Sequence, residues 1–151
     1  MNIVEFLNEK NLTISCAESF TGGLYANHVT NIPHASKCFM GGLVCYDPSI
    51  KINVLGVNPE TIEKLGTISK ECCTEMVEKC AKLFNSDIAV AFTGNAGPTT
   101  SENKPAGLCY VGLCCPKKNL LIVNELNLTG TREEVKEQAV KIIDELIFVL
   151  F

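Results

Sequence analysis

The sequence predicts one α/β domain, a three-layer α/β/α sandwich on a mixed central sheet. Helix-like and strand-like apolar patterns alternate through most of the chain, which is typical of helices packed on both faces of a sheet. The run IAVAF at residues 88–92 is apolar without interruption, as in strands that are covered on both sides. Two strand-like segments later follow each other directly, which predicts an antiparallel pair. The length of 151 residues, 46% of them hydrophobic, suits a single domain over residues 1–151.

Strands are expected where short apolar runs end at glycine, proline or polar residues. The run at 40–46 is interpreted as a second buried strand, with Gly41 and Gly42 indicating a bulge or a close backbone approach. Pro116 and Asn119 bound a short turn between the last two strands. The expected strands cover residues 13–17, 40–46, 88–92, 107–114 and 120–128.

Helices are expected where apolar residues recur at helical spacing after a capping residue. Asp47, Asn58 and Ser69 each stand where a side chain can accept from the first helical turn. Gly56 and Gly66 then end two of the helices. The expected helices cover residues 2–9, 22–31, 49–55, 59–65, 70–84 and 133–151.

Composition argues against several classes of function. The formal net charge is −4 and lysine and arginine form no run, so no nucleic-acid partner is expected. No stretch approaches the ~20 apolar residues of a membrane helix, and the N-terminus MNIVEFLNEK has acids where a signal peptide is basic. We therefore expect a cytoplasmic protein without a membrane partner, in which a small anionic ligand would need only a local positive site.

The nine cysteines are a high count, and their arrangement is informative. Their number is odd, no CxxC occurs and only two histidines are present, so the spacing typical of zinc sites is absent. We expect reduced thiols that serve mostly as small buried hydrophobes, without disulfide or metal. The cysteines are Cys16, Cys38, Cys45, Cys72, Cys73, Cys80, Cys109, Cys114 and Cys115.

The stretch CAESFTGG at residues 16–23 places Ser19 where a strand gives way to a helix. Backbone N–H groups at a helix start are unpaired. A hydroxyl beside such donors can attack a carbonyl whose developing negative charge the donors hold. The alternative is that Ser19 or Thr21 is only an N-cap and that Gly22 and Gly23 only make the turn.

Two more strand ends carry polar residues of the same kind. Tyr46 ends the second expected strand, with Lys51 just beyond it, and Thr93 with Gly94 follows the run at 88–92. Sites in open α/β sheets collect outside the carboxyl ends of the strands. The three stretches are therefore expected to meet in one crevice.

Six stretches carry a resemblance to a known family: AESFTGG, FMGGLVCYDPSIK, GTIS, DIAVAFTGNAGP, KPAGLCYVGL and TGTRE. In order and spacing they resemble the CinA C-terminal domain family, also known as nicotinamide-nucleotide amidohydrolase or NMN deamidase. The resemblance runs from about Asn11 to the last helix. Larger members carry an additional N-terminal domain, and this chain looks like a stand-alone form.

The resemblance implies an enzyme that hydrolyses the carboxamide of nicotinamide mononucleotide to nicotinate mononucleotide and ammonia. It implies no cofactor, a nucleotide as the small-molecule partner, and leaves a homo-oligomer open. The nucleophile would be Ser19 and the base Lys51, with its pKa lowered by burial or by a nearby cation such as Arg132. Tyr46 would be the third catalytic residue, between or beside the other two, where it would orient them and relay the proton to the departing ammonia. Substrate contacts would fall on Thr21, Gly22, Gly23, Thr93, Gly94 and Arg132. Among these, backbone N–H groups near Thr21 and Gly22 would hold the oxyanion and Arg132 the phosphate.

Three departures from the family pattern concern the same region. Phe20 stands where members commonly have a small residue, and Asn95 where they have isoleucine or a similar residue. The loop after Pro98 usually contains glycines and here reads TTSEN, residues 99–103. Phe20 and the altered loop favour the alternative hypothesis, a domain that binds a pyridine nucleotide or similar phosphate ligand without turnover. A structural or interaction module that leaves these residues unused is the third reading.

Overall fold

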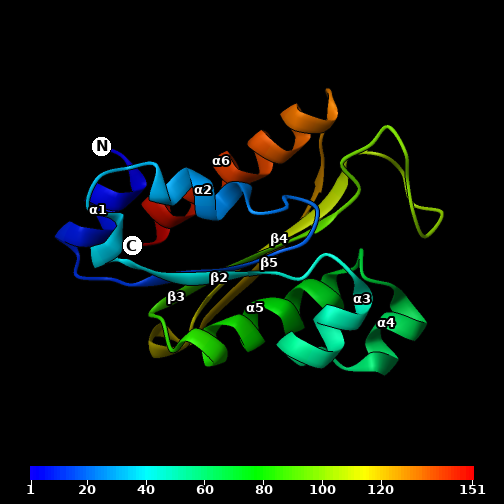
Figure 1. Cartoon of the computed structure of the whole chain (residues 1–151), viewed down its shortest axis with the longest axis horizontal. Coiled ribbons are helices and arrows are strands. Elements are labelled where there is room, and N and C mark those ends of the chain that lie inside the picture. Colours follow the sequence, from blue (N-terminus) through cyan, green and yellow to red (C-terminus); the bar gives the residue numbers. More distant parts are fainter.

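A five-stranded mixed sheet forms the middle layer of the protein, and the computed structural model describes all residues 1–151 (Figure 1). The strand order is β2-β1-β3-β4-β5. β1 pairs in parallel with β2 and β3, whereas β4 pairs antiparallel with both β3 and β5. The mixed sheet predicted from the sequence is thus confirmed. The strands are β1 Ile14–Glu18, β2 Phe39–Val44, β3 Ile88–Gly94, β4 Leu108–Cys115 and β5 Leu120–Asn127.

Helices cover both faces of this sheet. α1, α2 and α6 lie on one face, and α3, α4 and α5 on the other (Figure 1). Both chain termini lie at one end of the molecule, by α1. None of the helices has the length and hydropathy that crossing a membrane requires. The helices are α1 Ile3–Glu9, α2 Leu24–Thr30, α3 Pro48–Ile50, α4 Pro59–Leu65, α5 Lys70–Phe84 and α6 Arg132–Leu150, with a π-helical turn at Lys51–Leu55 after α3.

The predicted central strand is confirmed. β3 occupies the middle of the sheet, and its side chains from Ile88 to Phe92 are all 0% exposed. A strand that is hydrogen-bonded on both edges and covered on both faces explains the unbroken apolar run.

The prediction that residues 40–46 form a buried strand is wrong. β2 is an edge strand, and its residues alternate between partly buried and exposed, with Met40 and Val44 exposed. Apolar character alone could not distinguish an edge strand from a central one. The close approach expected at the two glycines is present, because a Cβ on Gly42 would meet the Cys16 sulfur, and the β1–β2 register is irregular between Ile14 and Ser15.

The predicted helix caps are confirmed. The side chains of Asp47, Asn58 and Ser69 each accept from a backbone N–H in the first turn of α3, α4 and α5. Gly56 and Gly66 follow the π-helical turn and α4 with positive φ. The signals that fixed these boundaries are local in sequence, so they could be read without knowledge of the fold.

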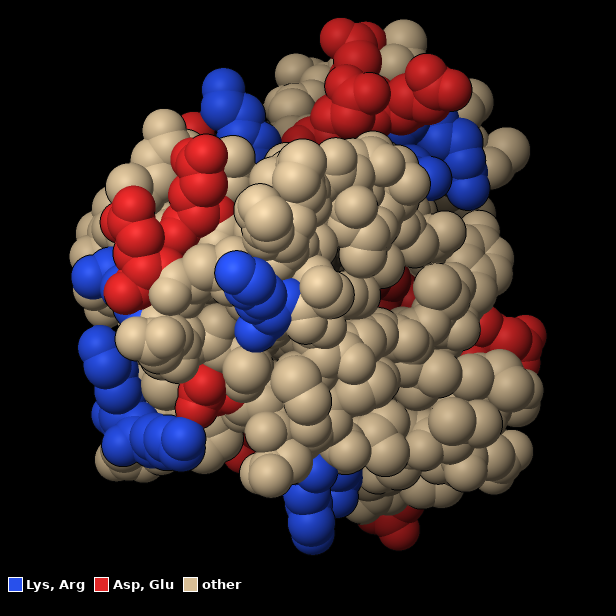
Figure 2. Space-filling model, turned by 60° about the vertical axis from the view of Figure 1, so that its left-hand side comes forward, with Lys and Arg blue, Asp and Glu red and all other residues tan.

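All nine cysteine side chains are buried, as the composition predicted. Five of them pack in the core between the sheet and α5, whereas the core on the α6 side is mainly aliphatic and aromatic. On the face drawn in Figure 2, basic side chains stand in small separate groups among acidic ones. The cysteines of the α5 side are Cys45, Cys72, Cys73, Cys80 and Cys114.

Candidate active site

Ser19 is held at the end of β1 by the sheet itself. Its backbone N–H donates to the carbonyl of Phe92 on β3 at 2.9 Å, which continues the β1–β3 pairing by one residue. Its own carbonyl accepts from the N–H of Gly22 at 3.0 Å. The N-cap of α2 is Gly23, which has φ +101° and no side-chain cap. The alternative that Ser19 or Thr21 serves as the N-cap is therefore excluded.

A buried carboxylate, Glu18, caps α2 in their place. One of its oxygens accepts from the N–H of Tyr25 at 2.8 Å and the other from that of Ala26 at 3.1 Å. Glu18 is 1% exposed and directly precedes Ser19. Glu18 therefore connects the start of α2 to β1, the strand that leads into Ser19. The sequence did not predict this contact, because Glu18 lies several residues before the start of the helix that it caps.

Lys51 is the second buried polar group of the site and lies directly beside Ser19. Its Nζ is 2.8 Å from the Ser19 Oγ, and it donates to the carbonyls of Cys45 at 2.7 Å and Tyr46 at 3.0 Å. The residue is 1% exposed. The π-helical turn after α3 brings this side chain back under the end of β2.

Burial lowers the pKa of Lys51 below its ordinary value of 10.5. The thiols of Cys45 and Cys72 and the carboxylates of Asp47 and Glu102 oppose this shift, but burial outweighs them. Burial also raises the pKa of both thiols, that of Cys72 to about 12. These thiols are uncharged at neutral pH, so they place no anion beside the lysine. The lowered pKa expected of Lys51 is present, and its main cause is desolvation, not a neighbouring cation.

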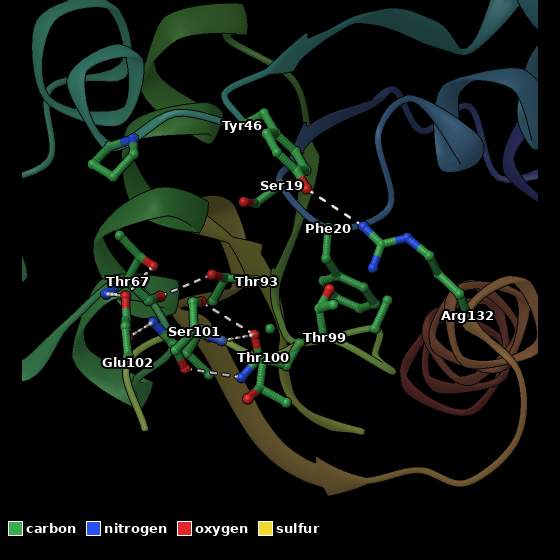
Figure 3. A pocket seen from close by; sticks show the side chains of 15 residues that line it. Ser19, Phe20, Tyr46, Thr67, Thr93, Thr99, Thr100, Ser101, Glu102 and Arg132 are labelled. Atoms are coloured by element: carbon green, nitrogen blue, oxygen red, sulfur yellow. Dashed lines mark hydrogen bonds between the residues drawn. The ribbon is translucent and has the colours of Figure 1, made fainter. Parts of the chain in front are cut away.

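Tyr46 and Arg132 stand together at the mouth of the site (Figure 3). The Tyr46 side chain is 59% exposed, and its hydroxyl makes no hydrogen bond to Ser19 or Lys51. It accepts instead, at 3.5 Å, from Nη2 of Arg132, whose Nη1 donates to the carbonyl of Gly97 at 2.8 Å. The backbone carbonyl of Tyr46, not its phenol, contacts the lysine.

A cavity of about 370 Å³ opens over Ser19. Tyr46, Thr93, Gly94 and Arg132 line it together with Ser19, so the three predicted strand ends do meet. The Thr93 hydroxyl donates to the carbonyl of Thr67 at 2.8 Å. Arg132 is the one basic side chain in the lining, and no group of three or more His, Cys, Asp or Glu side chains could hold a metal ion.

The turn residues Thr21, Gly22 and Gly23 lie behind Ser19 and do not line the cavity. The N–H of Gly22 is already used by the Ser19 carbonyl, which removes it as the expected oxyanion donor. The N–H groups of Phe20 and Thr21 have no acceptor within the protein. The Thr21 hydroxyl is also buried without a partner. The donors available beside the hydroxyl are thus those of residues 20 and 21.

The far wall of the cavity was not assigned from the sequence. It consists of Thr99, Thr100, Ser101 and Glu102 from the loop between β3 and β4, with Asn95 beneath them. Phe20 lines the cavity on the Ser19 side and is 5% exposed. The only signal for this wall was that its residues depart from the family pattern.

Comparison with known proteins gives a consistent family. The model of the CinA C-terminal domain matches residues 1–148. A competence-damage inducible protein of Bacillus thuringiensis (strain Al Hakam) is 43% identical over 138 residues, which are 91% of this chain and 33% of that protein. The chain thus spans about a third of the length of the curated relatives it matches.

Solved structures match over nearly the whole chain. The competence/damage inducible protein CihA from Agrobacterium tumefaciens has a TM-score of 0.92 at 30% identity, covering 98% of this chain and 90% of its own. The competence damage-inducible protein A (ComA) from Klebsiella pneumoniae has a TM-score of 0.91 at 27% identity, covering 96% and 89%. The α/β sandwich is therefore shared with these proteins.

Proposed function

This chain belongs to the CinA C-terminal domain family, and we propose that it hydrolyses the carboxamide of nicotinamide mononucleotide to nicotinate mononucleotide and ammonia. The observation that carries the proposal is the 2.8 Å contact between Lys51 Nζ and Ser19 Oγ at the base of a cavity that Ser19 lines. A buried lysine beside a serine hydroxyl is a known alternative to the histidine of a catalytic triad. The nine buried thiols support a reducing compartment, so the reaction is proposed for the cytoplasm.

Lys51 is the proposed general base. A serine hydroxyl is weakly nucleophilic until a base takes its proton. When Lys51 is neutral, its two N–H bonds are directed to the carbonyls of Cys45 and Tyr46, and its lone pair faces the Ser19 hydroxyl. The two carbonyls thereby orient the base, and burial provides the neutral form by lowering the pKa of the lysine.

Ser19 Oγ would attack the carboxamide carbon, and its proton would pass to Lys51. The backbone N–H of Phe20, which lines the cavity and has no acceptor within the protein, would hold the oxyanion. Collapse of the tetrahedral intermediate would break the C–N bond, with Lys51 returning the proton to the leaving nitrogen as ammonia. Water would then hydrolyse the acyl-enzyme ester, with Lys51 again as the base.

Arg132 would hold the substrate phosphate at the mouth of the cavity, because it is the only basic side chain there. Tyr46, in contact with Arg132, would position this guanidinium, and its carbonyl would position the lysine. Thr93 and Gly94 would form the floor beneath the substrate. The cavity volume of about 370 Å³ lies in the range of small-molecule sites.

Binding without turnover is the second candidate function, and Phe20 favours it. Its large, buried side chain lines the cavity together with Ser19, at a position where the family pattern commonly has a small residue. Both candidates require the cavity to accept a pyridine nucleotide, so binding alone does not separate them.

Ammonia release separates the two candidates. Purified protein is incubated with nicotinamide mononucleotide, and ammonia is assayed enzymatically. We expect turnover by the wild type and a loss of at least about 10³-fold in kcat for Ser19→Ala. Ser36→Ala, at an exposed serine outside the cavity, is the matched control. Binding of the nucleotide by calorimetry without any ammonia would favour the second candidate, and ammonia release by Ser19→Ala at the wild-type rate would reject the mechanism.

A further inference from the structure

We infer that the segment of residues 99–101 is a preformed wall that binds the sugar hydroxyls of a phosphorylated ribosyl substrate, and that Glu102 and Asn95 are the positioning residues that hold it. The inference rests on the proposed function for the identity of the substrate. It is carried by contacts in the loop between β3 and β4, where two of the three family departures lie (Figure 3).

Glu102 fastens the loop to the turn between α4 and α5. One carboxylate oxygen accepts from the backbone N–H and the hydroxyl of Thr67, at 2.8 and 2.6 Å. The other accepts from the N–H of Ile68 at 3.0 Å and from Lys104 Nζ at 3.2 Å. A carboxylate offers about four acceptor positions, and all four are filled. Glu102 thus lines the cavity but has no free acceptor position for a ligand. Its role is therefore to position the loop.

The absence of a side chain at Gly66 leaves the space that the Glu102 carboxylate occupies. This glycine has φ +83°, and a Cβ added to it would meet the Glu102 Oε1 and the Lys104 Nζ. Lys104 in turn donates to the carbonyls of Leu65 and Ile68, at 2.9 and 2.6 Å. The residues at the end of α4 therefore pack closely against Glu102 and Lys104 of the loop, more than thirty residues later in the sequence.

Asn95 fastens the same loop from below. Its side-chain nitrogen donates to the carbonyls of Ser101 at 3.1 Å and Lys104 at 3.0 Å. Its side-chain oxygen accepts from the N–H of Ser101 at 3.1 Å and from its hydroxyl at 3.2 Å. The amide is 6% exposed and makes four hydrogen bonds. An isoleucine at this position could make none of them, so Asn95 and the TTSEN loop depart from the family pattern as one unit.

These fastenings hold the loop in a conformation that the chain does not prefer. Glu102 and Asn103 both have positive φ, +60° and +55°, without being glycine. Such conformations persist only where the surroundings determine them. The eight side-chain hydrogen bonds of Glu102 and Asn95 stabilise this conformation of the loop, so the wall is formed before a ligand binds.

The wall offers free hydroxyls to the cavity. Thr99 and Thr100 both line it, and neither hydroxyl makes a hydrogen bond within the protein. Arg132 stands on another side of the cavity and Ser19 at its base (Figure 3). A ligand with its amide at Ser19 and its phosphate at Arg132 would therefore place the intervening sugar against the two threonines, whose hydroxyls both donate and accept.

Glu102→Gln tests the positioning role. The amide keeps the size of the side chain but replaces acceptor positions with donors that face N–H groups. We expect KM for nicotinamide mononucleotide to rise about 10-fold, with kcat within about two-fold of wild type, and faster amide hydrogen exchange at residues 99–104. Glu60→Gln, an exposed carboxylate on α4, is the matched control. Unchanged KM and exchange, or a fall in kcat alone, would overturn the positioning role.

The double variant Thr99→Val/Thr100→Val tests the wall itself, with ribose 5-phosphate as a probe that needs no turnover. Calorimetry should show binding to the wild type and a loss of about 10-fold or more in the double variant, with hydrogen exchange at residues 101–104 unchanged. Thr61→Val, on α4 outside the cavity, is the control. Absence of probe binding to the wild type, or equal binding to both proteins, would overturn the inference that this wall binds the sugar.

The two arms separate this inference from the proposed reaction. Probe binding that depends on the threonines, without ammonia release, keeps the wall and rejects the amidohydrolase. Ammonia release with an unchanged KM in the double variant keeps the amidohydrolase and rejects the wall.

Discussion

The two sides of the cavity are built in different ways. On the side of Ser19 and Lys51, the contacts run to backbone groups of the sheet and its strand ends, and both residues are under a tenth exposed. On the side of residues 99–102, an exposed loop is held by the side chains of Asn95 and Glu102. The proposed chemistry would thus be positioned by the fold, whereas the proposed recognition would be positioned by a few replaceable side chains. Substitutions on the first side should change the rate, and those on the second should change binding.

The largest effect is expected for Lys51→Met. The variant removes the base but keeps an unbranched side chain in the buried space, so kcat for ammonia release should fall by about 10² to 10⁴-fold. KM should change little, because the lysine lies behind Ser19 and not in the cavity lining. Thermal unfolding checks that the protein is folded, and Lys64→Met on exposed α4 is the control. A kcat near the wild-type value would break the assignment of chemistry to this side.

A smaller effect, on binding, is expected for Arg132→Gln. Loss of a charge-assisted contact to the phosphate should raise KM by about 10-fold or more. Because burial is the main cause of the lowered pKa of Lys51, the acidic limb of the pH–rate profile should stay where it is, below pH 10.5. An upward shift of that limb in the variant would show instead that the guanidinium also acts on the base. Lys64→Gln again gives a matched change of charge.

The smallest effect concerns a contact outside the cavity, between α2 and α6. His28 on α2 lies 2.6 Å from Asp144 on α6, the helix that begins with Arg132. This hydrogen bond raises the pKa of His28 above its ordinary value of 6.5. The stabilisation is complete below pH 6.5 and is lost as the pH rises through the raised value, because the folded state holds the proton more tightly.

His28→Gln should therefore lower the free energy of unfolding more at pH 5.5 than at pH 8.5. The side chain is 36% exposed, so solvent screening limits the difference to about 0.5–1 kcal/mol. Urea unfolding at the two pH values measures it. His34→Gln, whose ring makes no hydrogen bond in the protein, is the control. An equal loss at both pH values would mean that packing, not charge, joins the two helices.

The sequence predicted most of the elements and the three strand ends that meet at the cavity, because both depend on local signals. Asp47, Asn58 and Ser69 cap the helices that follow them, and the run at 88–92 is central for the reason its composition indicates. The edge position of β2 could not be read, because pairing on one side or two leaves the same apolar pattern.

The far wall could not be predicted for a different reason. Glu102 accepts from Thr67 and Ile68, which lie 35 and 34 residues away, and no motif at either partner predicts the contact. Similarly, nothing local placed the Arg132 guanidinium on the Gly97 carbonyl, 35 residues distant. Contacts of this kind become visible only once the chain is folded, and here they position residues that line the cavity.

The fastening of the loop by Asn95 has a consequence for how such a protein can change. Its four hydrogen bonds reach Ser101 and Lys104, so the loop's conformation depends on one side chain at its base and one carboxylate at its tip. Residues 95–104 can therefore be exchanged as a cassette, together with the glycine that seats Glu102. If the proposed reaction holds, new substrate preferences would arise by exchange of this segment while Ser19 and Lys51 stay in place.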